Sequence, residues 1–127
     1  MERYMAEHQD RRAVALDIGA NIGSHTIRLA KYFRFVYAFE PQPRVFWQLS
    51  QNVRLNHVTN AALYNIALSD THSLAELSEN ATNQGNVAIT QRVPADGRRS
   101  FAAGNLVETW PLDDVLARSN EGYRWRL

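Results

Sequence analysis

The residues best suited to bind a ligand form a short glycine-containing turn near the start of the chain, in VALDIGANIG at 14–23. The apolar run ends in Asp17, and Gly19 then allows a sharp turn that leaves room for a ligand, because glycine has no Cβ. Asn21 is, after glycine, among the residues that best tolerate a positive φ. Gly23 would let the following helix pack close to the strand, and the first amide groups of that helix would be unpaired. Such a turn favours a carboxylate or a phosphate group.

A second carboxylate follows at Glu40, which ends the next apolar run, FVYAFE. It comes roughly 20 residues after Gly19, the spacing at which an acidic side chain meets a ribose in nucleotide-binding sheets. Because the carboxyl ends of neighbouring parallel strands share one crevice, we expect Asp17, the glycine turn and Glu40 to converge. The order Gly19, Asn21, Gly23 lacks the G-x-G-x-x-G spacing of a dinucleotide fingerprint, so it fits a pyrophosphate poorly. The alternative is an ordinary strand-to-helix turn followed by a surface glutamate.

The elements that must position these residues alternate through the first half of the chain. AVALDI predicts a strand buried on both faces, and SHTIRLAKYF has the apolar spacing of an amphipathic helix. FVYAFE predicts a second strand, RVFWQLSQNVRLN a second helix opened by Pro43 and stopped near Asn56, and AALYNIAL a third strand. This is the order of a parallel sheet with covering helices, so we predict a βαβαβ unit of the α/β class.

The second half of the chain is less regular. SLAELSEN and NVAITQRV predict a β-hairpin around the turn residues NATNQG, LVETW predicts a short strand, and PLDDVLARS a short helix begun by Pro111. RVPADGRRSFAAGN has the composition of a loop. The length of 127 residues suits a single domain over 1–127. Within it we expect a ligand-binding half at 13–70 and the hairpin, loop and short helix at 71–127.

The stretches VALDIGANIGSHTIRLAKYF, VYAFEPQPRVFWQLSQNVRLN and LYNIALSD resemble the S-adenosylmethionine-dependent methyltransferases of the FkbM type. In that family a D-x-G-A-N-x-G turn opens the sheet, E-P closes the second strand, and N-x-A-L-S-D follows the third. The resemblance covers residues 13–70, and NQGN and ETWPLDDVL resemble later family segments more loosely. It implies a class I, Rossmann-like sheet, S-adenosylmethionine as the cofactor, and O-methylation of a small molecule or a glycan.

The resemblance also implies which residues of the turn would meet the cofactor. Asp17 would brace the turn and approach the methionine end of S-adenosylmethionine. The backbone around Gly19, Asn21 and Gly23 would hold that same end.

For the nucleoside end of the cofactor, the resemblance points to the second and third strands. Glu40 would hold the ribose, and Pro41 would shape the adenine side. Asn65 and Ala67 would lie near the adenine, although the run AALYNIAL could equally be pure core. No catalytic residue is predicted, because methyl transfer depends mainly on in-line positioning of the acceptor.

The family pattern continues with a fourth strand that carries K-I-D-x-E-G, and no D-x-E-G occurs in this sequence. YRWRL would lead into that strand and ends at Leu127, so the resemblance indicates a chain truncated after the family's N-terminal half. A truncated gene, a split gene and an expression fragment would all give this pattern. Without the fourth strand, AVALDI becomes an apolar sheet edge with unpaired N–H and C=O groups. We expect that edge to favour self-association unless the hairpin, LVETW or another chain covers it.

Composition narrows the expected partners and location. The net charge of +1 argues against strong attraction to nucleic acid or anionic lipid, so we expect neither nucleic acid nor a membrane as a partner. No apolar run approaches the roughly 20 residues of a membrane span, and the charged N-terminus lacks the apolar centre of a signal peptide. We therefore expect a cytoplasmic protein. Cysteine is absent and the four histidines are dispersed, so no metal site is predicted.

The leading functional prediction is the S-adenosylmethionine-binding portion of a FkbM-like methyltransferase. Two alternatives stay open at this point. One is a non-catalytic truncated remnant or interaction module, whose sheet edge recruits a partner. The other is an NAD(P)-binding half-domain.

Overall fold

The computed structural model describes residues 2–79, 87–92 and 106–119. The chain divides into two compact units, Met1–Asn65 and Ile66–Leu127, and each unit has its own β-sheet. The sequence predicted the ligand-binding half to end at residue 70, whereas the first unit ends at Asn65. That the whole chain forms a single domain stays a prediction.

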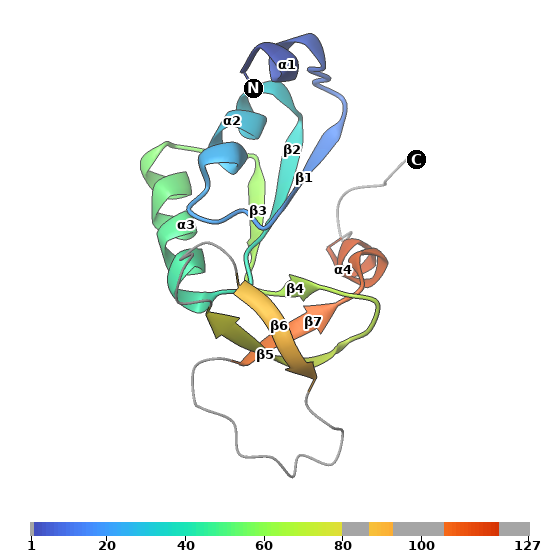
Figure 1. Ribbon diagram of the computed structural model, residues 1–127. Helices are drawn as coiled ribbons and strands as arrows, with labels where there is room; N and C mark the ends of the chain where they lie inside the picture. Colours follow the sequence, from blue (N-terminus) through green and yellow to red (C-terminus); the bar gives the residue numbers. More distant parts are fainter. Residues whose placement is uncertain (1, 80–86, 93–105, 120–127) are drawn as a thin grey trace. The chain divides into compact units, whose positions relative to one another are not determined.

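Unit 1 is a three-stranded sheet in the order β1-β2-β3, and both strand pairs are parallel. Its elements are α1 (Glu2–Glu7), β1 (Val14–Ile18), α2 (Ser24–Tyr32), β2 (Phe35–Phe39), α3 (Pro43–Leu55) and β3 (Ala61–Tyr64). Helices α2 and α3 lie on the same side of the sheet (Figure 1). The predicted strand–helix alternation is confirmed, including the start of α3 at Pro43 and its C-cap at Asn56.

The core of unit 1 lies between the sheet and these two helices. Leu49 and Val53 of α3 pack with Ala38 of β2 and with Ala20 of the glycine turn. The turn is therefore part of the core, because its Ala20 packs against α3. This packing fixes the position of the turn at the C-terminal edge of the sheet.

Strand β1 is an edge of its sheet, because among the described strands it pairs only with β2. Its residues Leu16 and Ile18 are 40% and 62% exposed, while Asp17 between them is buried. The prediction of a strand buried on both faces is therefore wrong. Within unit 1, α2 and α3 cover one face only, and an edge strand has a neighbouring strand on one side only.

Unit 2 contains a four-stranded sheet in the order β4-β7-β5-β6. Its elements are β4 (Ala67–Leu68), β5 (Ser73–Glu79), β6 (Val87–Arg92), β7 (Leu106–Trp110) and α4 (Leu112–Arg118). The predicted hairpin is confirmed by the antiparallel pairing of β5 with β6, and LVETW and PLDDVLARS form β7 and α4 as predicted. The turn NATNQG, most of the loop RVPADGRRSFAAGN, and YRWRL lie outside the described residues.

The single strand predicted for AALYNIAL is wrong. Residues 61–64 form β3 of the first sheet, and after a break at Asn65 the short strand β4 pairs with β7 of the second sheet. The apolar run is continuous in sequence, but its hydrogen bonds go to two different sheets. None of the helices in the described ranges could cross a bilayer, given their length and polarity.

Candidate functional site

The turn between β1 and α2 has left-handed backbone at the three predicted positions. The φ angle is +76° at Gly19, +52° at Asn21 and +95° at Gly23. The N–H groups of Gly19 and Ala20 both donate to the carbonyl oxygen of Phe39, each at 2.9 Å. The turn is thereby fixed to the C-terminal end of β2, and the prediction that Asn21 takes a positive φ is confirmed.

The two glycines of this turn meet different surroundings. A Cβ built on Gly23 would lie 2.7 Å from Cδ1 of Leu49, so this glycine lets the start of α2 approach α3. The sequence predicted a close approach to the strand instead. A Cβ on Gly19 would have no heavy atom within 4 Å. The space beside Gly19 is therefore open, as a position facing a ligand requires.

The carboxylate of Glu40 lies directly against the turn. Its Oε2 accepts a hydrogen bond from the Asn21 N–H at 2.9 Å, and its Oε1 accepts one from the Gln42 N–H at 2.9 Å. Glu40 is only 7% exposed, so the alternative of a surface glutamate is excluded. The predicted convergence of Glu40 with the glycine turn is confirmed. Each carboxylate oxygen can accept a further hydrogen bond, because it carries about two lone pairs.

Asp17 braces the first turn of α2. Its Oδ2 accepts a hydrogen bond from Oγ1 of Thr26 at 2.5 Å, and both residues are buried. This contact joins the end of β1 to the helix that follows. Thr26 falls at the helical spacing of the buried face of α2, but that spacing does not predict its bond to Asp17. Contact between Asp17 and a ligand stays a prediction.

The N-terminus of α2 is available to an anion. Gly23 is its N-cap, and no side chain in the described part of the chain caps the helix. Unpaired amide groups at such an end carry partial positive charge and favour a carboxylate. His25, in the first turn, is exposed.

Asn65 holds the segment that carries Glu40. Its Nδ2 donates to the carbonyl oxygens of Glu40 and Pro41, at 2.8 and 3.0 Å. The backbone N–H of Glu40 donates to the carbonyl oxygen of Tyr64 at 3.0 Å, so β3 anchors this segment twice. Roles for Asn65 and Pro41 near an adenine stay predictions. Ala67 lies in β4 of unit 2, where it belongs to that unit's buried core, and its role near an adenine stays a prediction.

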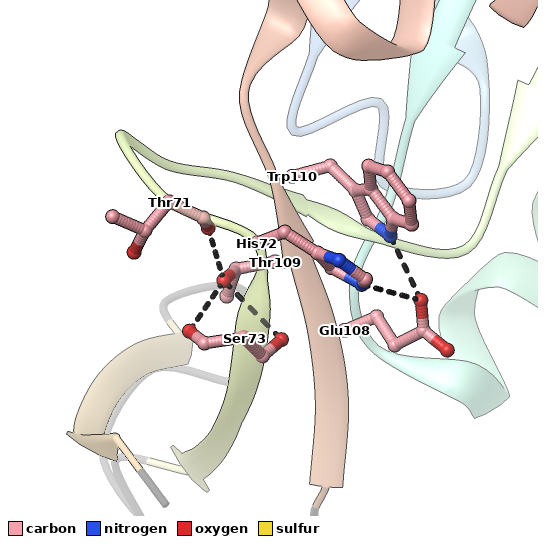
Figure 2. A network of polar contacts seen from close by, with 6 residues as sticks. All are labelled: Thr71, His72, Ser73, Glu108, Thr109 and Trp110. Carbon is pink, nitrogen blue, oxygen red and sulfur yellow. Dashed lines mark hydrogen bonds and ion pairs between the residues drawn. The ribbon is translucent and has the colours of Figure 1, made fainter. Parts of the chain in front are cut away.

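A second polar network surrounds β7 in unit 2 (Figure 2). Oγ1 of the buried Thr109 lies 2.8 Å from Oγ of Ser73, which joins β7 to β5. The rings of His72 and Trp110 stack at 3.6 Å, and Oε2 of Glu108 accepts a hydrogen bond from Nε1 of Trp110 at 2.8 Å. The His72–Glu108 pair is half exposed and 3.5 Å long, so it contributes little stability. These contacts are explained by strand pairing.

Metal binding has no evident basis in the described ranges, where no three His, Asp or Glu side chains are grouped closely enough to hold an ion.

Comparisons with known proteins find similarity over part of the chain. No family model matches the chain. A tRNA(Phe) (4-demethylwyosine(37)-C(7)) aminocarboxypropyltransferase of Methanocaldococcus jannaschii is 40% identical over 60 residues, which are 46% of this chain and 24% of that protein. A Dictyostelium discoideum protein named as a methyltransferase is 56% identical over 32 residues, which are 25% of this chain and 12% of that protein.

Among solved structures, M. jannaschii TYW2 in complex with AdoMet matches 49% of this chain and 29% of its own at 36% identity, with a TM-score of 0.44. The chain thus spans about a quarter or less of the length of the curated relatives it matches.

The parallel sheet and its glycine turn define the fold class of unit 1. It is a partial Rossmann-like α/β fold, as predicted. The cofactor predicted from the sequence is S-adenosylmethionine, and the M. jannaschii TYW2 structure is a complex with AdoMet. The names of these relatives give no support for the FkbM subtype.

The prediction that nucleic acid is not a partner is contradicted by these relatives, since the M. jannaschii protein is by its name a tRNA-modifying enzyme. The prediction relied on net charge, which hides how charge is distributed. Residues 1–65 contain eight Lys or Arg and five Asp or Glu, a balance of +3, whereas residues 66–127 contain six and eight, a balance of −2. A total near zero therefore says little about the charge of one surface.

Proposed function

We propose that this chain is the S-adenosylmethionine-binding portion of a methyltransferase that acts on RNA. The observation that carries the proposal is the contact between Glu40 and the Asn21 N–H, which joins the ends of two neighbouring parallel strands. Ligands of α/β sheets bind in crevices outside the carboxyl ends of the strands.

The residues present fit the proposed cofactor. The open space beside Gly19 admits a ligand close to the backbone, and the uncapped start of α2 suits the carboxylate of the methionine end. Glu40 is fixed by two backbone N–H groups and can still accept hydrogen bonds from ribose hydroxyls. When bound, S-adenosylmethionine supplies a methyl group on a sulfonium sulfur. The contribution of this chain is to hold and orient that group.

The acceptor and the transferred group are proposed from the relatives. RNA as the acceptor rests on the name of the M. jannaschii protein, whose transferred group is an aminocarboxypropyl group. A methyl group rests on the name of the D. discoideum protein. Membership of the FkbM type remains a prediction from the sequence motifs, as does O-methylation.

Binding is tested by isothermal titration calorimetry of the full chain with S-adenosylmethionine and, separately, with NAD. We expect saturable heat with S-adenosylmethionine only. Heat with NAD alone would favour the NAD(P)-binding alternative, and no heat with either ligand would reject the proposed site.

Transfer is tested with two labelled forms of S-adenosylmethionine, one labelled in the methyl group and one in the carboxyl group. Bulk tRNA serves as the acceptor, and incorporated label is counted after precipitation. We expect label from the methyl form only. Label from the carboxyl form only would show aminocarboxypropyl transfer, and label from neither, despite cofactor binding, would favour the non-catalytic alternative.

A further inference from the structure

The segment from Ile18 to Asn65 has an unusually one-sided charge. Its only acidic residue is Glu40, which is buried in the crevice. The same segment carries five basic residues: Arg28, Lys31, Arg34, Arg44 and Arg54. The charged side chains that this segment itself presents to solvent are therefore all basic.

Two of these basic residues share the outer face of α3 with an exposed tryptophan. At 3.6 residues per turn, positions 44, 47, 48, 51, 54 and 55 fall on one side of the helix, opposite the buried Leu49 and Val53. Trp47 and Leu55 on that side are 64% and 73% exposed. Arg44 and Arg54 are also exposed, and neither forms an ion pair with an acid of the described ranges. This side of α3 therefore presents an exposed aromatic ring between two exposed cations.

We propose that this outer face of α3 binds a single-stranded segment of RNA, an inference that rests on the proposed function. Arg44 and Arg54 lie about 15 Å apart along the helix axis, given a rise of about 1.5 Å per residue. That span suits a backbone that passes several phosphates along the helix. Trp47 lies between them and offers a ring on which an unpaired base stacks.

The position of α3 connects this face to the crevice. The helix begins at Pro43, three residues after Glu40, so its Arg44 end is the one next to the strand ends that form the cofactor site. An RNA strand bound along α3 would therefore extend from its Arg44 end toward Glu40. The remaining side chains of the face are Gln48 and Gln51, which add hydrogen-bonding groups without adding negative charge.

The test measures fluorescence anisotropy of a labelled 12-nucleotide single-stranded RNA with the full chain, over a series of salt concentrations. We expect R44Q/R54Q to reduce the slope of log K against log salt by about 1.4, since each phosphate contact on a single strand contributes about 0.7. W47A is expected to weaken binding about fivefold to about a hundredfold, because a stacked base is lost. The matched control is R11Q/R12Q, which removes the same charge from exposed positions outside the Ile18–Asn65 segment.

Failure of this proposal is separable from failure of the proposed function, because S-adenosylmethionine binding of every variant is measured by calorimetry in parallel. The proposal is overturned if wild type does not bind the RNA, or if R11Q/R12Q weakens binding as much as R44Q/R54Q. It is also overturned if the face binds vesicles of phosphatidylserine and phosphatidylcholine in preference to RNA. Loss of RNA binding in R44Q/R54Q and W47A, with retained cofactor binding, supports it.

Discussion

Replacing Glu40 with glutamine keeps the length of the side chain but removes its charge and one acceptor oxygen. In the protein, both carboxylate oxygens accept backbone N–H bonds, from Asn21 and from Gln42, each at 2.9 Å. Glutamine can accept only one of these, so its NH₂ group faces the other N–H. A hydrogen bond to a charged group contributes about 1.5–3 kcal/mol, so we expect Glu40→Gln to lower the free energy of unfolding by about that amount.

The same change should weaken cofactor binding. If ribose hydroxyls donate to the Glu40 carboxylate, loss of one such bond costs about 1.5–3 kcal/mol, which raises the Kd about tenfold to about 150-fold. Calorimetric titration with S-adenosylmethionine measures the Kd, and urea unfolding followed by circular dichroism measures the stability. The two measurements together separate a binding effect from simple loss of fold.

The matched control is Asn60→Ala. Nδ2 of Asn60 donates to the carbonyl oxygens of Ala30 and Phe33, at 2.9 and 3.2 Å, beside the N-terminal ends of β2 and β3. Its loss destabilises unit 1 by about 1–2 kcal/mol at the end of the sheet opposite the crevice. A Kd for Glu40→Gln within about threefold of wild type, or an equal loss of affinity in Asn60→Ala, would refute the assignment of Glu40 to the ribose.

Three further substitutions test how the crevice is built. Gly23→Ala should destabilise by about 2–4 kcal/mol, measured by urea unfolding, because its Cβ would meet Leu49 at 2.7 Å and its φ is +95°; an unchanged midpoint would contradict this packing. Thr26→Val should cost about 1–3 kcal/mol because it leaves the buried Asp17 carboxylate without its hydroxyl donor, and a neutral effect would show that water replaces the donor. Asn65→Ala should raise the Kd for S-adenosylmethionine about threefold to about tenfold, because the carbonyl oxygens of Glu40 and Pro41 lose a hydrogen-bond donor. Calorimetry measures the Kd, and a wild-type value would show that Asn65 has no role in cofactor binding.

The glycine turn and Glu40 were predictable because their signals are local. A buried run, a positive-φ residue at Asn21 and an acid at the end of the next strand follow one another in sequence, and parallel strand ends meet at one edge. The contacts that fix this geometry were less visible. Thr26 bonds to Asp17 across nine residues, and Asn65 to Glu40 across twenty-five, so no periodicity reveals them.

Two of the wrong predictions are the single strand over AALYNIAL and the exclusion of nucleic acid as a partner. The run AALYNIAL reads as one strand, yet β4 pairs with β7 some forty residues later, which local apolarity does not encode. The partner prediction used the total charge, whereas the basic residues concentrate in unit 1 and its acids are largely buried or N-terminal. Counting charge by segment would have found that asymmetry from the sequence alone.

An NMR titration of the ¹⁵N-labelled full chain with S-adenosylmethionine tests most directly whether the cofactor binds beside the glycine turn and Glu40. We expect saturable shifts in the amide resonances of Gly19, Asn21 and Gln42, because the first lies beside open space and the other two donate to the Glu40 carboxylate. Saturable binding that leaves these three amides unchanged and shifts resonances elsewhere would contradict this placement of the cofactor.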